Sequence, residues 1–207
     1  MKKLLIKSLI AVAFIFSIVS CNKTKDEPTA TNIYSIELEN YDEVSSAIDE
    51  LEIILHSNVT ENNLSLGRFP FNSQKIEFPT PTSIPDDIFS LFKTGFNMDI
   101  SKMQFSNEAM KNAFVVINFY KDGKELDATL NGFTRAKNTM VMTNMMYADR
   151  DCDVTGEAQD DYGFSYTYDM HIKNGYNVVY TIIDENTYNA RIQTEFSEPI
   201  SWQVSLH

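Results

Sequence analysis

The feature that most constrains the fold is a switch to period-two alternation of apolar residues in the second half of the chain. Apolar residues alternate along 113–119 and again along 126–130, with Asp122-Gly123 between the two runs. Pairing Lys121 with Lys124 across a two-residue turn places both apolar sets on one face, which is the register that a hairpin with one buried face requires. This segment is therefore predicted to form an antiparallel hairpin.

The same pattern continues to the C-terminus. Asn174-Gly175 separates 166–172 from 179–183, and pairing these runs across a second tight turn again places the apolar residues on one face. Further alternating runs lie at 139–147, 188–196 and 200–206. About seven antiparallel strands are therefore expected in 112–207, and consecutive hairpins favour a meander in the form of a sandwich or an open barrel.

The preceding part, 33–111, is predicted to be helical and irregular. Apolar residues at helical spacing predict a helix over 40–56, with Asn40 and Glu43 in the positions of a capping box. A second short helix is expected over 85–94, and four prolines mark 64–85 as extended, with an edge strand near 74–78. The predicted class is α+β: one or two N-terminal helices packed on the β meander in one compact domain.

The first twenty residues have the organisation of a signal peptide. Lys2, Lys3 and Lys7 precede an apolar run over 9–19, and the small residue Ser20 follows it. A membrane span needs about 20 apolar residues, and this run is shorter. Residues 1–20 are therefore expected to direct secretion and to be removed.

The sequence Ile18-Val19-Ser20-Cys21 resembles the lipobox of bacterial lipoproteins. This resemblance implies cleavage before Cys21 and acylation of its thiol, and more than one acyl chain gives stable anchoring. The next residues include Lys25-Asp26-Glu27, which resembles the export signal of Bacteroidota-type surface lipoproteins. The expected location is the outer membrane, exposed on the cell surface, with a periplasm-facing position as the alternative. Residues 21–32 are polar and are expected to act as a flexible tether.

The amino-acid composition of the secreted body limits the kinds of molecule that it can bind. Removing residues 1–20 leaves 187 of 207 residues and, because three lysines leave with them, takes the net charge from −12 to −15. Such an acidic body is a poor partner for nucleic acid. Cys152 is the one cysteine left beside the lipid anchor, so no intrachain disulfide is expected and the fold depends on its apolar core.

A cluster of acidic residues follows the third predicted strand. The carboxylates of Asp149, Asp151 and Asp153 stand at alternate positions, and Asp160 follows. The spacing resembles the start of a calcium-binding loop, whereas Val154 occupies the position where that loop needs glycine. Calcium is the one cofactor that the sequence suggests, and a solvated loop is the alternative.

Two surfaces of the predicted 166–183 hairpin are candidates for binding. The aromatic set Tyr162, Phe164, Tyr166 and Tyr168 shares one face and is interpreted as core, with a glycan platform as the alternative. The opposite face, half apolar and half polar, is the best candidate contact surface, and it carries Asp169, His171, Tyr176 and Tyr180.

No phosphate-binding loop, zinc motif or nucleophile elbow is found in the sequence. The expected function is therefore a non-enzymatic binding or structural role in the cell envelope, with a protein or glycan partner and a membrane contact through the lipid. An immunity protein that neutralises a secreted toxin is the first alternative, and an anchored hydrolase is the second.

Overall fold

The body of the protein is built almost entirely from β-strands. The computed structural model describes residues 34–207 apart from 97 and 137, which is the part of the chain discussed below. Its elements in chain order are β1 (Tyr34–Glu37), α1 (Tyr41–Val44), β2 (Glu50–His56), β3 (Asn63–Pro70), β4 (Lys75–Phe78), β5 (Ser90–Leu91), the 3-10 helix η1 (Phe92–Gly95), β6 (Asp99–Phe105), β7 (Lys111–Lys121), β8 (Lys124–Glu125), β9 (Ala128–Ala136), β10 (Thr139–Ala148), β11 (Cys152–Gln159), β12 (Ser165–Ile172), β13 (Gly175–Asp184), β14 (Ala190–Gln193) and β15 (Ser201–Leu206).

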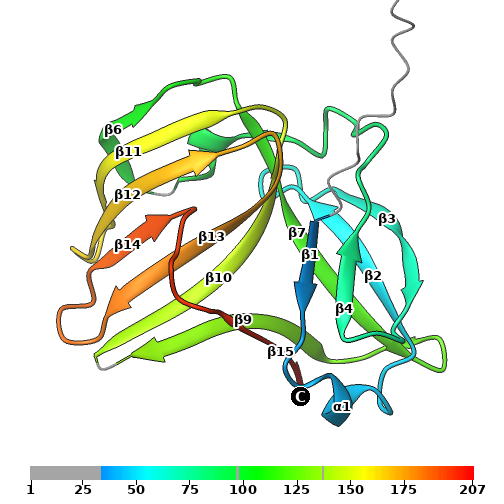
Figure 1. The fold of residues 1–207 in the computed structure, drawn as a ribbon. Coiled ribbons are helices and arrows are strands. Elements are labelled where there is room, and N and C mark those ends of the chain that lie inside the picture. Colours follow the sequence, from blue (N-terminus) through cyan, green and yellow to red (C-terminus); the bar gives the residue numbers. More distant parts are fainter. Residues whose placement is uncertain (1–33, 97, 137) are drawn as a thin grey trace, which may run out of the picture. The chain divides into compact units, whose positions relative to one another are not determined.

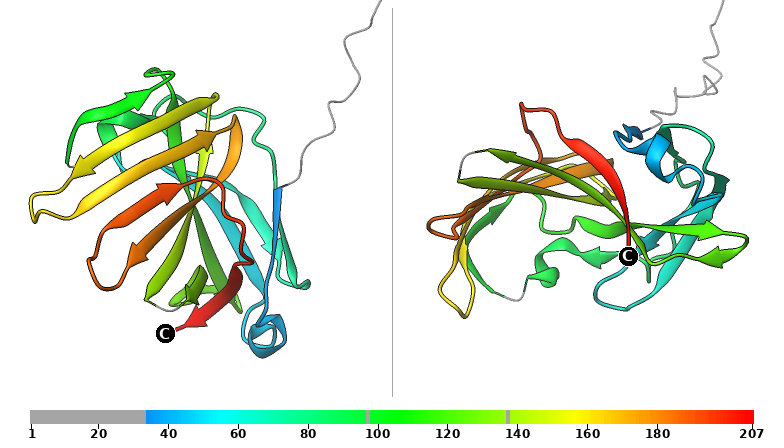
Figure 2. Two further views of the ribbon diagram at one scale, coloured as in Figure 1. Left: turned by 60° about the vertical axis from the view of Figure 1, so that its left-hand side comes forward. Right: turned by 90° about the horizontal axis from the view of Figure 1, so that it is seen from below.

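Thirteen strands form one large sheet, and β1 pairs with β4 in a separate two-stranded sheet (Figure 1). The main path of the large sheet is β3-β2-β7-β10-β13-β14-β12-β11-β6, with β5 and β8 on β7, β9 on β10, and β15 on β9. Its strand pairs are antiparallel, apart from the parallel pair β12–β14. The right-hand view of Figure 2 shows the sheet curling around the segment that carries η1. The prediction of a mostly antiparallel β protein is confirmed, but the expected strand number is wrong, because the described residues contain fifteen strands rather than about seven.

The predicted helix over 40–56 is wrong. Only the four-residue α1 is helical there, and β2 occupies 50–56. Leu51, Ile53 and Leu55 are buried at alternate positions, so the period-two pattern within this segment outweighs its helical stripe. β2 lies between β3 and β7, and both neighbours supply backbone hydrogen-bond partners that an isolated sequence does not reveal.

The predicted helix over 85–94 is wrong as well, because β5 and η1 occupy its second half. The predicted edge strand near 74–78 is confirmed as β4. The remaining extended region contains β3, which the prolines of 64–85 concealed. The part before residue 112 is therefore a set of strands rather than helices packed on a sheet.

The two predicted turns have different outcomes. Asp122 and Gly123 both have positive φ, 51° and 73°, and Lys121 pairs with Lys124, so the first tight turn is confirmed. The expected ladder between 113–119 and 126–130 is wrong, because strand pairing ends at Tyr120–Glu125 and β9 pairs with β10 and β15 instead of β7. The second hairpin is wrong: β12 and β13 do not pair with each other, because β14 lies between them and bonds to both. Gly175 has φ of 104°, and the chain there turns a corner between two separated strands.

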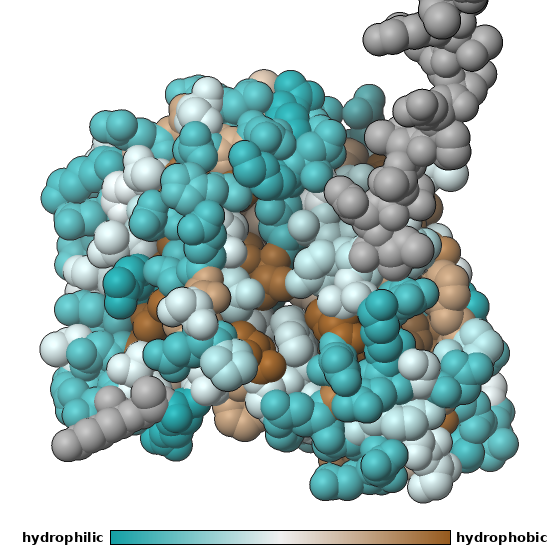
Figure 3. All heavy atoms as spheres, viewed as in Figure 1, coloured by the Kyte–Doolittle hydropathy of each residue, from teal (hydrophilic) through white to brown (hydrophobic). Residues whose placement is uncertain are grey.

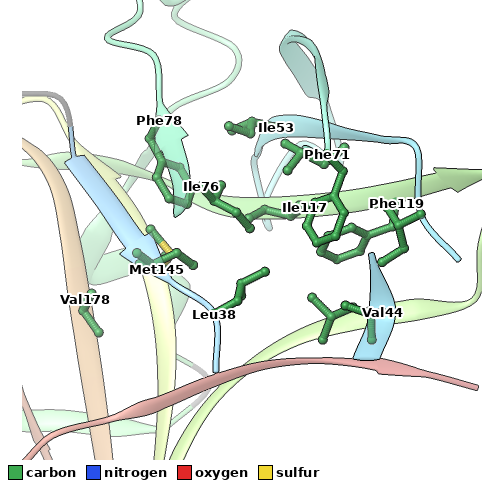
Figure 4. Packing of buried hydrophobic residues seen from close by; sticks show 14 residues of the cluster. Leu38, Val44, Ile53, Phe71, Ile76, Phe78, Ile117, Phe119, Met145 and Val178 are labelled. Atoms are coloured by element: carbon green, nitrogen blue, oxygen red, sulfur yellow. The ribbon is translucent and has the colours of Figure 1, made fainter. Parts of the chain in front are cut away.

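The apolar interior has two main parts. The first lies where the β1–β4 sheet meets β2, β7, β10 and β13, and Figure 4 shows Phe78, Ile76 and Leu38 pointing toward Ile117 and Met145. The second lies on the face of the large sheet against which η1 packs, and it includes Met146, Tyr168 and Met170. We call this second surface the η1 face. Cys21 and the predicted export signal, Lys25 to Glu27, lie outside the described residues.

Candidate ligand-binding pocket

A pocket of about 180 Å³ opens on the η1 face, between the curled sheet and η1. Its walls come from β7, β10, β12, β13 and β14, and its remaining sides come from η1 and from Asn58 in the loop after β2. The lining residues are Asn58, Phe92, Gly95, Phe96, Asn112, Phe114, Asn144, Met146, Tyr168, Met170, Val179, Thr181 and Ile192. The pocket is slightly larger than an apolar protein cavity of roughly 150 Å³ that binds benzene.

Two aromatic rings, Phe92 in η1 and Phe96 directly after it, set the shape of the pocket. Phe92 and Phe96 meet edge to face with centroids 5.1 Å apart, and Phe96 meets Tyr168 in the same way at 5.5 Å. The Tyr168 hydroxyl donates to Met98 Sδ at 3.6 Å, and burial raises the pKa of Tyr168 to about 12. This hydroxyl therefore stays neutral at physiological pH, and the ring serves as a wall.

A hydrogen-bonded loop positions Asn58. The buried hydroxyls of Ser57 and Ser90 bond at 2.9 Å, and the Thr60 hydroxyl donates to the backbone carbonyl of Asp87 at 2.7 Å. Gly95 lies close to this loop, and a Cβ there would lie 3.2 Å from Nδ2 of Asn58. Glycine therefore allows η1 and the Asn58 amide to approach closely.

Three amides give the pocket its polar character. The side chains of Asn58, Asn112 and Asn144 line it, and Asn112 is only 4% exposed. Asn58 and Asn144 are exposed, and no buried side-chain nitrogen or oxygen in the described part of the chain lacks a hydrogen-bond partner. Neutral amides that line an apolar pocket and are open to solvent can exchange water for a polar group of a ligand.

The lining also limits the chemistry of the pocket. Among its described residues, Tyr168 is the one titratable side chain, and its raised pKa removes it from proton transfer near neutral pH. The rest is apolar or uncharged. The pocket is therefore suited to holding a ligand by apolar contact and neutral hydrogen bonds.

The predicted contact surface is divided by the structure. Tyr180 and Asp169 both pair with Gln193 of β14, so they share a face but are separated by an inserted strand. Tyr176 is covered by the β1–β4 sheet, where its hydroxyl donates to the carbonyl of Pro79 at 2.6 Å, and Tyr180 stacks on Phe196. The four predicted residues therefore do not form one open surface.

His171 and Asp169 are exposed on the face opposite the η1 face. His171 Nδ1 lies 2.8 Å from a carboxylate oxygen of Asp153, and its Nε2 lies 3.8 Å from Asp169. The hydrogen bond with Asp153 raises the pKa of His171, because the carboxylate stabilises the imidazolium. This is a solvated ion pair on the surface.

The residues of the calcium candidate are distributed along and beside β11. Asp149 accepts from the backbone of Lys111, Asp151 from Lys173 and the backbone of Asn174, and Asp153 pairs with His171. Asp160 lies beyond the far end of β11, where it caps the loop to β12. The sequence did not predict β11, whose length separates Asp160 from the other three carboxylates. Over residues 34–207, without 97 and 137, no group of three acidic, histidine or cysteine side chains is arranged to hold a metal.

The aromatic set divides between core and surface. Tyr168 is buried and Tyr166 is half-buried, which agrees with the core interpretation, whereas Tyr162 is 88% exposed and Phe164 is 40% exposed. Cys152 is a buried free thiol. No helix in the described residues is long and apolar enough to cross a membrane.

The sequence contained a weak signal for the pocket. Asn112 and Asn144 occupy positions on the η1 face where alternation calls for apolar residues, and Met142 and Met146 flank Asn144 on that face. The signal was missed because no local pattern brings β7, β10 and η1 together. Comparison with protein-family models, with curated proteins and with solved structures gives no match to this chain.

Proposed function

We propose that this protein is a lipid-anchored protein of the cell envelope that binds a small, mostly apolar ligand in the pocket beside η1 without chemical conversion. The observation that carries the proposal is the pocket itself, which combines a mostly apolar lining with the neutral amides of Asn58, Asn112 and Asn144. An apolar cavity with a few convergent polar groups is the usual form of a small-molecule site. The lipobox at Cys21 supports the location.

The binding role is tested with indole, an apolar molecule that carries one hydrogen-bond donor. In residues 22–207, which contain the complete described body, indole is expected to shift the amide resonances of Val179, Thr181 and Ile192. Thr181→Trp fills the pocket and should abolish these shifts. Its matched control is Thr167→Trp, at an exposed position of β12 on the opposite face, which should bind indole normally.

Circular dichroism and urea melts establish that both variants fold. If indole and hexanol both leave the resonances of the folded parent unchanged, the pocket is not a binding site and the proposed function is wrong. Equal binding by Thr181→Trp and the parent would place the ligand elsewhere and have the same consequence.

The anchoring role is tested with Cys21→Ala in the full-length chain. Removing the thiol removes the acyl chains, so the variant should leave the membrane fraction on washing at high salt. Replacing Lys25, Asp26 and Glu27 by alanine should retain membrane association but reduce antibody labelling of intact cells. A Cys21→Ala variant that stays in washed membranes would exclude lipid anchoring at this residue.

A further inference from the structure

The pocket continues into a row of mostly apolar side chains across the sheet. Residues paired directly across neighbouring strands share a face. Tyr168 pairs with Ile192, Ile192 with Thr181, Thr181 with Met142, and Met142 with Phe133. Tyr168, Ile192 and Thr181 line the pocket, so Met142 and Phe133 extend the same row beyond it.

The outer end of the row is open to solvent. Phe133 is 43% exposed and Met142 is 40% exposed, although both lie on the face that is buried under η1 farther along. Val116 of β7 alternates with Phe114, which lines the pocket, and it is 38% exposed. Large apolar side chains that are exposed together and continue a cavity indicate a binding surface.

The row is about as long as an extended alkyl chain. It crosses β12, β14, β13, β10 and β9, which is four strand spacings or about 19 Å. Methionine side chains are flexible and polarisable, so Met142 and Met146 adapt to a long ligand without a fixed shape. Figure 3 shows the face of the body that is turned away from η1, which is mostly hydrophilic with a few apolar groups near the middle of the view.

The absence of cationic side chains from the pocket lining limits which polar group a ligand can carry. No lysine, arginine or histidine lines the pocket, so an ionised carboxylate or phosphate would lose its hydration without gaining a cationic partner. A hydroxyl, ester or amide would instead bond to the amides of Asn58, Asn112 or Asn144. We infer that the ligand is an unbranched acyl or alkyl chain with an uncharged polar head, which lies in the pocket and extends along the row to Phe133.

This inference rests on the proposed binding function and is tested with primary alcohols from hexanol to dodecanol, each below its aggregation concentration. Each buried methylene contributes about 0.8 kcal/mol, or roughly fourfold in affinity when fully buried. The dissociation constant should therefore fall by about two- to fourfold per methylene until the chain reaches Phe133. Dodecanoate at neutral pH should bind more weakly than dodecanol.

Met142→Asp and Phe133→Asp separate the row from the pocket. Both positions are exposed, so the fold should be retained, and dodecanol should bind about tenfold more weakly while hexanol binds within about twofold of the parent. The matched control is Leu206→Asp on β15, where the leucine is 46% exposed and lies outside the row. It should bind both alcohols like the parent.

The outcomes distinguish the two proposals. If hexanol and indole bind but longer alcohols bind no better, or if Met142→Asp leaves dodecanol affinity unchanged, the extended-chain inference is wrong and the pocket function stands. Tighter binding of dodecanoate than of dodecanol would overturn the uncharged head. If no alcohol and no indole binds, the pocket function fails as well.

Discussion

At the scale of single residues, Asn177 explains why the chain turns at 173–175 without a hairpin. Its side chain is buried, its Nδ2 donates to the carbonyls of Lys173 and Gly175 at 2.7 and 2.9 Å, and its Oδ1 accepts from the Lys173 amide at 2.9 Å. The Lys173 amide and carbonyl are the backbone groups that a two-residue turn would have paired with residue 176. One amide therefore replaces the ladder and allows β12 and β13 to diverge around β14.

Asn177→Ala should lower the free energy of unfolding by about 1–3 kcal/mol, because it leaves backbone groups near the corner without partners. Asn174→Ala is the control, since the Asn174 side chain is exposed, and it should cost well under about 1 kcal/mol. Urea midpoints provide the comparison. Similar midpoints for the two variants would mean that the side chain of Asn177 does not hold the corner.

At the scale of elements, β2 shows how two periodicities compete within one segment. The residues of 50–56 satisfy a helical stripe, but β2 pairs with both β3 and β7, and its alternate residues are buried. A short segment of seven residues gains little from helix formation alone, because helix nucleation is unfavourable. The partners on both sides therefore determine its conformation.

Ile53 and Ile54 provide a matched test of this conformation. Ile53 is fully buried, and Ile54 faces the other side of the sheet and is half-buried. Ile53→Ala should cost about 2–5 kcal/mol, whereas Ile54→Ala should cost clearly less, as thermal or urea unfolding would show. A larger loss for Ile54→Ala would contradict the observed register of β2.

At the scale of the whole described body, the C-terminal strand connects both ends of that body. Nδ2 of Asn40 donates to the carbonyl of Val204 at 2.8 Å, and the Val204 amide donates to Oδ1 of Asn40 at 3.0 Å. The Glu39 amide also donates to the carbonyl of Trp202 at 2.9 Å. Asn40 was expected to cap a helix, but its side chain forms no cap hydrogen bond and instead holds β15.

Asn40→Ala should therefore destabilise the body by about 1–3 kcal/mol, since it leaves the Val204 amide and carbonyl without these partners. Asn186→Ala removes an exposed side chain in the loop after β13 and is the control, with an expected change within about 0.5 kcal/mol. Denaturant unfolding measures both values. An Asn40→Ala midpoint equal to that of the control would show that β15 docks without this contact.

Local chemistry explains what the sequence by itself determined. The β-rich class, the tight turn at Asp122-Gly123 and the edge strand at β4 follow from alternation and turn residues, which act over a few neighbouring positions. The lipobox and the export signal are read from short motifs of the chain and remain predictions.

Only the tertiary structure decided the rest, because it depends on pairing between distant segments. β2 became a strand through its neighbours, β14 entered between β12 and β13, and Asn58, Asn112 and Asn144 met at one pocket from separate elements. The spacing of residues along the sequence does not predict these strand pairings or the convergence of the three asparagines. Each depends on contacts between distant segments that form only when the sheet has curled. The sequence therefore determined the local conformations, and the curled sheet determined the candidate site.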